Sequence, residues 1–220
     1  MSKNFPKNKY KKAFTIIELM VVIGIFAILS TIMIFNYGKF NSSLSIKNLA
    51  DDIALTVRRA QGFAIGVRGY TNDFSQGYGI RFTANTGSDI YAGSNKAFIL
   101  FADMASNSKY DYSNSKTCGI PTASNECIEA LSIKSNDGIK AIYYNEKSEG
   151  QKVNSGGTLD ILFRRPNPEP IFCIRNNPTS TNCDALGSIT SMIIEISSLS
   201  NPDIYKTVII SNNGQISVSD

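Results

Sequence analysis

The pattern of apolar positions begins with a long run near the N-terminus. Residues 14–35 are almost entirely apolar, and Glu18 is the single charged residue among them. These 22 positions correspond to about 33 Å of α-helix, against roughly 30 Å for the hydrocarbon core of a bilayer. The run therefore predicts a transmembrane helix over residues 14–35.

A helical periodicity continues beyond this run. Apolar residues recur at spacings of three and four, at Ile46, Leu49, Ile53, Val57, Ala60, Ala64 and Val67. The charged residues lie mainly off this stripe, at Lys47, Asp51, Asp52, Arg58 and Arg59. This pattern predicts an amphipathic continuation of the helix over residues 36–68, with its apolar face on a sheet. Gly62, Gly66 and Gly69 weaken the pattern, so we expect the helix to end near Arg68.

From residue 69 onward the apolar pattern has the period of β-strands. The predicted strands are Tyr78–Phe82, Ala97–Ala102, Ile139–Tyr144, Leu159–Arg164, Ile171–Ile174, Ile189–Ile196, Ile204–Ile210 and Gln215–Val218. Turn sequences at Asn201-Pro202-Asp203 and Asn212-Asn213-Gly214 favour antiparallel hairpins among the last three. The expected fold class is α+β, a long N-terminal helix packed on an antiparallel β-sheet, with residues 69–220 as a β-rich domain.

Charge is distributed unevenly around the apolar run. Five lysines precede it, at Lys3, Lys7, Lys9, Lys11 and Lys12, whereas only Lys39 follows it closely. The positive-inside rule therefore places the N-terminus in the cytoplasm and exports the residues after about 36. The whole chain has a net charge of +4, but without residues 1–13 the net charge is −1. The basic character thus belongs to the first residues and does not indicate binding to nucleic acid.

Lys11-Lys12-Ala13 followed by Phe14-Thr15-Ile16-Ile17-Glu18-Leu19 resembles the signature of type IV prepilins and type II secretion pseudopilins. The resemblance implies that residues 1–13 are a leader, cut between Ala13 and Phe14 by a prepilin peptidase that then methylates the new N-terminus at Phe14. The family usually has glycine at the position of Ala13. A plain signal anchor is the alternative, but it leaves a glutamate beside a basic, cleavable leader unexplained.

Glu18 is the residue to which the resemblance assigns a role in assembly. An ionised acid within hydrocarbon costs about 2.5–3.5 kcal/mol on insertion scales, so it usually has a partner. The free ammonium of Phe14, in the same subunit or a neighbouring one, is the partner that the resemblance implies. Two buried opposite charges roughly break even once desolvation is counted, so we expect this pair to set the stagger between subunits rather than to add stability.

Three further segments resemble H-type minor pseudopilins and T-type minor pilins: residues 49–67 with Arg58-Arg59-Ala60, then 77–82, and the closing stretch 208–216. The implied function is that of a minor pilin or pseudopilin, a structural subunit of a type II secretion pseudopilus or a type IV pilus. Its implied partners are other pilin subunits, prepilin peptidase and lipid of the cytoplasmic membrane, from which it would pass into the filament.

The alternative function is DNA capture during uptake, which the family associates with arginines near the final hairpin. Here that stretch is Gly214-Gln215-Ile216-Ser217 and contains no arginine. Phosphate binding draws chiefly on Lys and Arg, so nucleic acid is disfavoured as a partner, although Arg164-Arg165 and Arg58-Arg59 could form a local patch.

Four cysteines, Cys118, Cys127, Cys173 and Cys183, fall in the part expected to be exported, where disulfides form. Three connectivities are possible, and we expect the local pairs Cys118–Cys127 and Cys173–Cys183. A four-thiolate zinc site normally has shorter spacings between paired ligands, and it remains an alternative together with unpaired thiols.

The chain contains no histidine, which excludes Ser-His-Asp and Cys-His catalysis and histidine-bound zinc. We expect no enzyme activity, cofactor or metal. Residues 104–118, rich in Ser, Asn, Lys and Tyr, are expected to form a surface insertion because little there favours ordering.

Overall fold

A computed structural model describes most of the chain. The described residues are 14–66, 69–70, 75–87, 89–113, 116–146, 148, 151–154, 156–176, 183, 189–199 and 201–219. The expected leader (residues 1–13) and the expected helix end (Val67 and Arg68) lie outside them. The chain divides into two compact units, residues 1–41 and 42–220, which are considered separately below.

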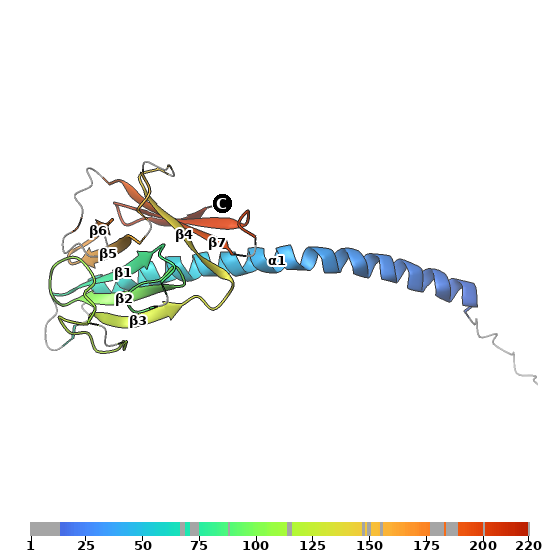
Figure 1. Cartoon of the computed structure of the whole chain (residues 1–220), viewed down its shortest axis with the longest axis horizontal. Coiled ribbons are helices and arrows are strands. Elements are labelled where there is room, and N and C mark those ends of the chain that lie inside the picture. The colour runs from blue at the N-terminus through green and yellow to red at the C-terminus, as the bar shows by residue number, and fades with distance from the viewer. Residues whose placement is uncertain are drawn as a thin grey trace, which may run out of the picture. The chain divides into compact units, whose positions relative to one another are not determined.

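The described part of the chain begins with one long helix, α1 (Ile16–Ile65), which belongs to both units (Figure 1). In the first unit the large apolar side chains of α1 are exposed, among them Leu19, Phe26 and Met33. By length and composition α1 is able to cross a membrane.

Within the described residues of the second unit, nine strands form two sheets, and every pairing between these strands is antiparallel (Figure 1). The strands are β1 (Gly77–Thr83), β2 (Ala97–Asp103), β3 (Cys127–Ser132), β4 (Asp137–Tyr144), β5 (Thr158–Arg164), β6 (Asn167–Arg175), β7 (Ser191–Ser198), β8 (Tyr205–Ser211) and β9 (Ile216–Ser219). The order is β3-β2-β1-β5-β6 in the five-stranded sheet and β4-β7-β8-β9 in the four-stranded sheet. The α+β class expected from the sequence is therefore confirmed.

The second-unit part of α1 packs against both sheets through the predicted apolar stripe. Ile46, Ile53 and Val57 are fully buried, in one cluster with residues such as Ile80 of β1 and Ile194 of β7. Lys47, Asp51, Asp52, Arg58 and Arg59 are exposed, as the periodicity predicts. The stripe works because residues three and four apart share one face of a helix.

Two features of the sheets differ from the sequence expectation. Strand β3 was not predicted, because it is a short edge strand and most of its side chains are only partly buried, so its apolar alternation is weak. The strands also form two sheets rather than one. Alternation reports which face of a strand is buried, but it does not report which strands are neighbours. The hairpins β7–β8 and β8–β9 are antiparallel as predicted.

Candidate assembly site

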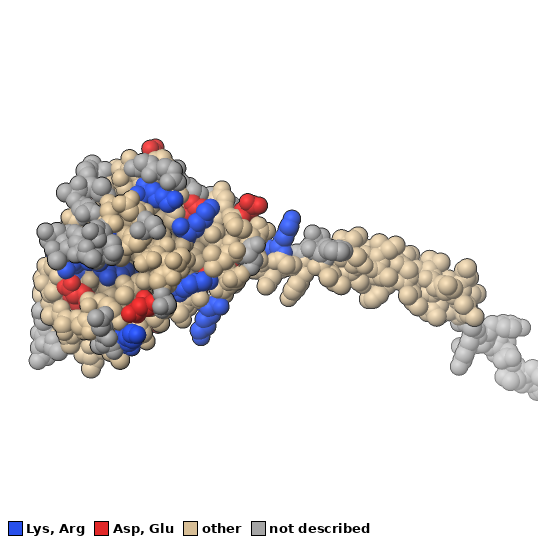
Figure 2. Space-filling view, in the orientation of Figure 1, with Lys and Arg blue, Asp and Glu red and all other residues tan. Residues whose placement is uncertain are grey.

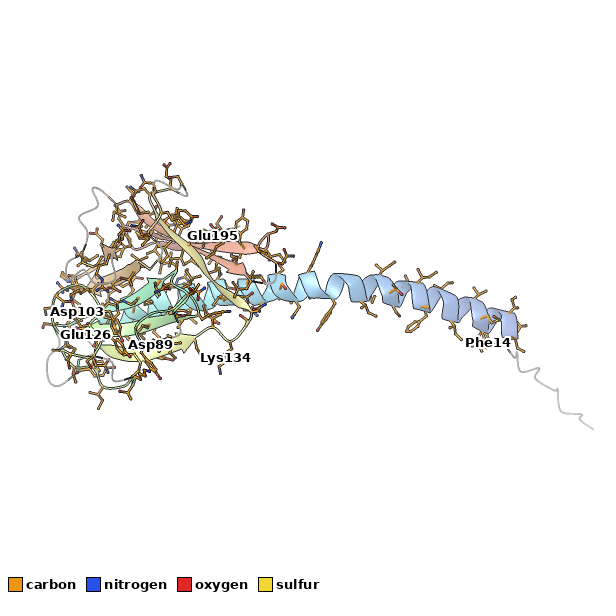
Figure 3. The ribbon with its side chains drawn as sticks, in the orientation of Figure 1. Phe14, Asp89, Asp103, Glu126, Lys134 and Glu195 are labelled. Carbon is orange, nitrogen blue, oxygen red and sulfur yellow. A yellow bond between two sulfur atoms is a disulfide. The ribbon has the colours of Figure 1, made fainter. Side chains whose placement is uncertain are left out.

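The N-terminal turn of α1 is built around a helix cap. Thr15 precedes the first helical residue, and its Oγ1 accepts a hydrogen bond from the backbone N–H of Glu18 at 3.3 Å. The backbone N–H of Leu19 donates to the Thr15 carbonyl at 3.2 Å. A threonine cap with a glutamate three residues later is the capping-box pattern, which satisfies amides that a helix leaves free at its start. Local sequence therefore determines that α1 begins at Ile16, two residues after Phe14 (Figure 3).

Glu18 lies in this first turn, where the helix dipole favours a negative charge. The side chains around it are apolar and open to the surroundings: Phe14 is 81% exposed and Ile16 is 80% exposed. The visible face of the apolar segment shows no Lys, Arg, Asp or Glu atoms in Figure 2. The site is thus a single carboxylate set in an apolar surface, and such a surface is normally covered by lipid or by other apolar chains.

Comparison with known proteins matches this same segment. Residues 8–34 match the family described as the prokaryotic N-terminal methylation motif. This chain carries a prepilin-type signal. No curated protein and no solved structure gave a significant match to the chain. The prepilin-type signal is that of type IV pilins and pseudopilins, which are substrates of prepilin peptidase and are structural rather than enzymatic proteins.

The prepilin-type signal and the apolar helix together fit a membrane-anchored protein with a single pass. They also imply assembly with other pilin-class subunits in general. Ala13 lies outside the described residues, so cleavage between Ala13 and Phe14 stays a prediction. The methylation of Phe14 and the assembly role of Glu18 stay predictions as well.

The four cysteines lie in the second unit and are paired locally. Cys118 is bonded to Cys127 with Cα atoms 4.8 Å apart, and Cys173 to Cys183 with Cα atoms 5.0 Å apart. These are the two pairs expected from the sequence. Cys127 begins β3 and Cys173 lies in β6, the two edge strands of the five-stranded sheet. Each disulfide therefore joins an edge strand of this sheet to a cysteine outside the strands.

A buried ion pair joins the central strand of the same sheet, β1, to its neighbour β5. Arg81 of β1 and Asp160 of β5 are register partners, and the guanidinium binds both carboxylate oxygens at 2.6 and 2.7 Å. Arg175 of β6 approaches the same carboxylate at 3.6 Å. The side chain of Asp160 is fully buried. Bidentate geometry of this kind is the arrangement in which a buried pair best offsets its desolvation.

This ion pair holds the insertion that follows β2. The backbone N–H of Tyr110 donates to Asp160 at 3.1 Å, and Arg81 donates to the Tyr110 carbonyl at 2.9 Å. The Tyr110 ring is 1% exposed and packs on Phe101, with ring centroids 5.4 Å apart. Residues 104–118 are thus mainly a surface insertion, as expected. However, Tyr110 and the Asp160 carboxylate that it contacts hold this segment against the sheet.

Two more carboxylates hold the insertion by accepting hydrogen bonds from its backbone (Figure 3). Glu126 accepts from the N–H groups of Ala105 and Asp111 at 2.9 and 2.8 Å. Asp103 accepts from those of Asn107 and Ser108, both at 3.0 Å. Each carboxylate therefore accepts hydrogen bonds from two backbone N–H groups that would bind water in an exposed loop.

Burial changes the titration of this cluster. Desolvation is the main cause that raises the pKa of Glu126, the two backbone hydrogen bonds oppose it, and the nearby carboxylates of Asp103 and Asp111 add to it, so that the pKa is about 7. Burial also raises the pKa of the Tyr110 hydroxyl above its ordinary value. Glu126 is therefore a carboxyl group that titrates near neutral pH.

Sequence reasoning missed Thr15 and the carboxylate cluster. Thr15-x-x-Glu18 carries a readable signal, the capping box. Arg81 and Asp160 each interrupt an apolar strand with a charge, which also signals a buried pair. No local signal identifies Glu126, because its partners are up to 21 residues away in the sequence. Within the described part of the chain, no group of three or more potential metal ligands is found.

Proposed function

We propose that this protein is a minor pilin or pseudopilin, a structural subunit of a type II secretion pseudopilus or a type IV pilus. Prepilin peptidase cuts it between Ala13 and Phe14 and methylates Phe14, and residues 14–35 anchor the subunit in the cytoplasmic membrane until it enters the filament. One observation carries this proposal: a prepilin-type signal runs into the apolar residues 14–35, where Glu18, in the first turn of α1, is the sole carboxylate.

The role proposed for Glu18 follows from charge in an apolar medium. After cleavage, the ammonium of Phe14 and the carboxylate of Glu18 are the two charges of the apolar segment. The cap bond uses only the backbone N–H of Glu18, so its carboxylate remains for a partner. Pairing it with Phe14 of a neighbouring subunit neutralises both charges. Because such a pair gains little net energy, its contribution is to select one axial register.

Export of the second unit is supported by its chemistry. Two disulfides suit an oxidising compartment outside the cytoplasm. The five lysines of residues 1–13 favour a cytoplasmic N-terminus. The cysteine-bearing insertions suit a specialised, low-copy subunit, which is why we propose a minor subunit.

DNA capture finds less support. Arg164 of β5 is hydrogen-bonded and ion-paired to the buried Asp103, so it belongs to the cluster that holds the insertion. The closing hairpin contains no arginine between residues 208 and 219. We therefore do not propose nucleic acid as a partner.

The intact mass of the protein from membranes, with and without a co-expressed prepilin peptidase, tests the proposal. We expect a mass of residues 14–220 plus one methyl group, only with the peptidase. Ala13→Gly is the matched control, since it restores the usual residue before the cut. If the variant is processed and the wild type is not, Ala13 blocks cleavage. If both keep the full-length mass, the protein is a plain signal anchor and the proposal fails.

A further inference from the structure

The second unit carries exposed lysines at the end where α1 enters it. Residues 42–48 of α1 lie there beside the β3–β4 loop (residues 133–136) and the β7–β8 turn (residues 199 and 201–204). Lys47 belongs to α1 and Lys134 to the β3–β4 loop, and both are exposed. No ion pair or hydrogen bond joins the ammonium group of either lysine to another described residue. Both charges are therefore available to a partner outside the chain.

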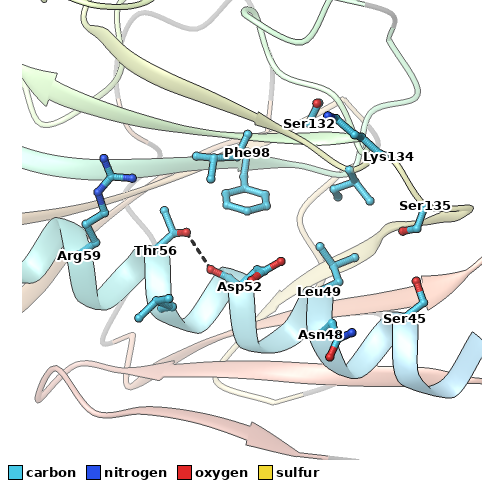
Figure 4. A pocket seen from close by; sticks show the side chains of 13 residues that line it. Ser45, Asn48, Leu49, Asp52, Thr56, Arg59, Phe98, Ser132, Lys134 and Ser135 are labelled. Atoms are coloured by element: carbon cyan, nitrogen blue, oxygen red, sulfur yellow. Dashed lines mark hydrogen bonds between the residues drawn. The ribbon is translucent and has the colours of Figure 1, made fainter.

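Contacts between these segments fix the positions of the charges. Ser45 of α1 donates a hydrogen bond at 2.5 Å to the buried Asp137, which begins β4 directly after the loop. Lys134 and Ser45 line the same hollow, of about 530 Å³, between α1 and the end of β3 (Figure 4). The backbone N–H of Leu199, in the β7–β8 turn, donates to the Asn136 carbonyl at 2.8 Å. The loop, the turn and α1 thus form one continuous surface.

The lysines of this surface lie on different sides of α1. Successive residues of an α-helix are rotated by about 100°, so Lys47 points to the side of α1 opposite Ser45 and Lys134. On a further side, the half-buried Lys206 of β8 lines a hollow of about 330 Å³ together with Ser43. Lys47, Lys134 and Lys206 therefore surround the helix at one level, and we call them the lysine collar.

Apolar side chains accompany the lysine collar. Leu44, Leu199 and Tyr205 are 43%, 52% and 41% exposed at this end of the second unit. Within the described residues of the three segments and the start of β8, Asp203 is the exposed carboxylate, whereas Asp137 is buried. Lysines and a tyrosine interspersed with leucines are typical of a surface at a membrane interface, where apolar stems and charged tips meet lipid and water.

The length of the chain brings this surface within reach of the membrane. The expected transmembrane segment ends at residue 35, and residues 36–41 connect it to the second unit. Within this link, Tyr37 and Phe40 are exposed, and aromatic side chains are common at membrane interfaces. A link of this length spans at most about 20 Å, and the headgroup layer on each side of a bilayer is about 5–7 Å thick.

We propose that the lysine collar binds the headgroups of anionic phospholipids in the outer leaflet of the cytoplasmic membrane. The inference rests on the proposed function, which anchors residues 14–35 in that membrane and exports the second unit. It adds a contact that the anchor does not make, because an apolar helix does not distinguish headgroup charge. Each lysine near an anionic membrane surface increases binding by about fivefold, and salt screens this attraction. Lysines on several sides of the anchoring helix match a plane of headgroups around that helix.

Quenching by lipid headgroups tests this contact. The full chain, processed by prepilin peptidase, is placed in vesicles of phosphatidylcholine alone or of equal parts phosphatidylcholine and phosphatidylglycerol, each with a lipid that is spin-labelled on its headgroup. A fluorophore on Ser135→Cys reports on the β3–β4 loop. A fluorophore on Ser113→Cys reports on the insertion, which Asp103 and Glu126 hold at the other end of the second unit (Figure 3). Both serines are exposed.

We expect the ratio of docked to undocked protein, calculated from quenching at Ser135→Cys, to be at least about tenfold higher with phosphatidylglycerol. High salt should remove this difference. The label at Ser113→Cys should be quenched little in either lipid. Equal quenching at Ser135→Cys in the two lipids would overturn the inference, because it would show proximity through the anchor without recognition of headgroup charge.

Charge-removing variants test which lysines act. Lys47→Gln with Lys134→Gln should lower the docked-to-undocked ratio in phosphatidylglycerol vesicles by on the order of twentyfold. Lys116→Gln with Lys152→Gln is the matched control, since it removes the same charge from the insertion and from the segment that bridges to Tyr143, near the far end of β4. This control should dock like the wild type. Equal losses in both variants would overturn the inference, because net charge and not the lysine collar would then be the cause.

The intact mass of each sample separates the two proposals. Processed chains whose docking does not depend on headgroup charge would overturn this inference and leave the proposed function intact. Chains that keep residues 1–13 with active peptidase would overturn the proposed function, whatever the quenching shows. Formation of both disulfides, read from the same masses, shows that a variant has folded.

Discussion

The stability of the second unit should depend on pH through Glu126. Its folded pKa is about 7, against an ordinary value of 4.5. Because the folded protein holds this proton more tightly than the unfolded chain does, the free energy of unfolding should rise as pH falls from about 7 to about 4.5. The difference of about 2.5 pH units corresponds to at most about 3 kcal/mol.

The structure indicates which segment should respond to this change of stability with pH. Ionised Glu126 is fully buried and lies near Asp103 and Asp111, so its charge opposes folding even though it accepts two backbone hydrogen bonds. Opening of the insertion exposes the carboxyl group to water and relieves this cost. We therefore expect the amides of Ala105 and Asp111 to exchange more readily at pH 8 than at pH 6, after correction for the intrinsic effect of pH.

Hydrogen exchange and thermal unfolding of the full chain in detergent, measured from pH 5 to pH 8, test this prediction. Glu126→Gln is the control because it cannot titrate, although its amide group satisfies only one of the two backbone donors. The difference in stability between wild type and variant should grow in favour of the wild type as pH falls. Parallel pH profiles for the two proteins would refute the reasoning, since other groups titrate in both.

Two further predictions concern single carboxylates. Glu18→Gln keeps the capping pattern but removes the charge, so membrane anchoring should persist. The fraction of the protein in filaments, measured by sedimentation and immunoblot, should fall on the order of tenfold. Incorporation at the wild-type level would contradict the assembly role. Asp160→Asn leaves both Arg81 and Arg175 without their buried counter-charge and should cost about 3–5 kcal/mol, whereas Arg81→Met alone, which leaves Asp160 with Arg175 as its ion-pair partner, should cost less. Chemical denaturation measures this difference, and equal losses would show that burial of uncompensated charge is not the cause.

Features that depend on neighbouring residues were predictable from the sequence. The apolar run, the cap at Thr15 and the stripe that includes Ile46, Ile53 and Val57 all follow from spacings within one element. The prepilin-type signal is likewise a contiguous motif. Such features are encoded locally because a helix brings together residues only three or four apart, so the period of the sequence is the period of the structure.

Tertiary structure alone decided the rest. Arg81 meets Asp160 across 79 residues of chain, and Tyr110 reaches the same carboxylate across 50. The alternation of apolar residues is the same for strands of either sheet, so it did not divide them into two sheets or identify β3. The raised pKa of Glu126 likewise depends on burial by a segment that composition alone describes as a surface insertion. Contacts between distant segments have no period in the sequence. They form only when the folded sheet and the insertion bury charged groups that water would otherwise solvate.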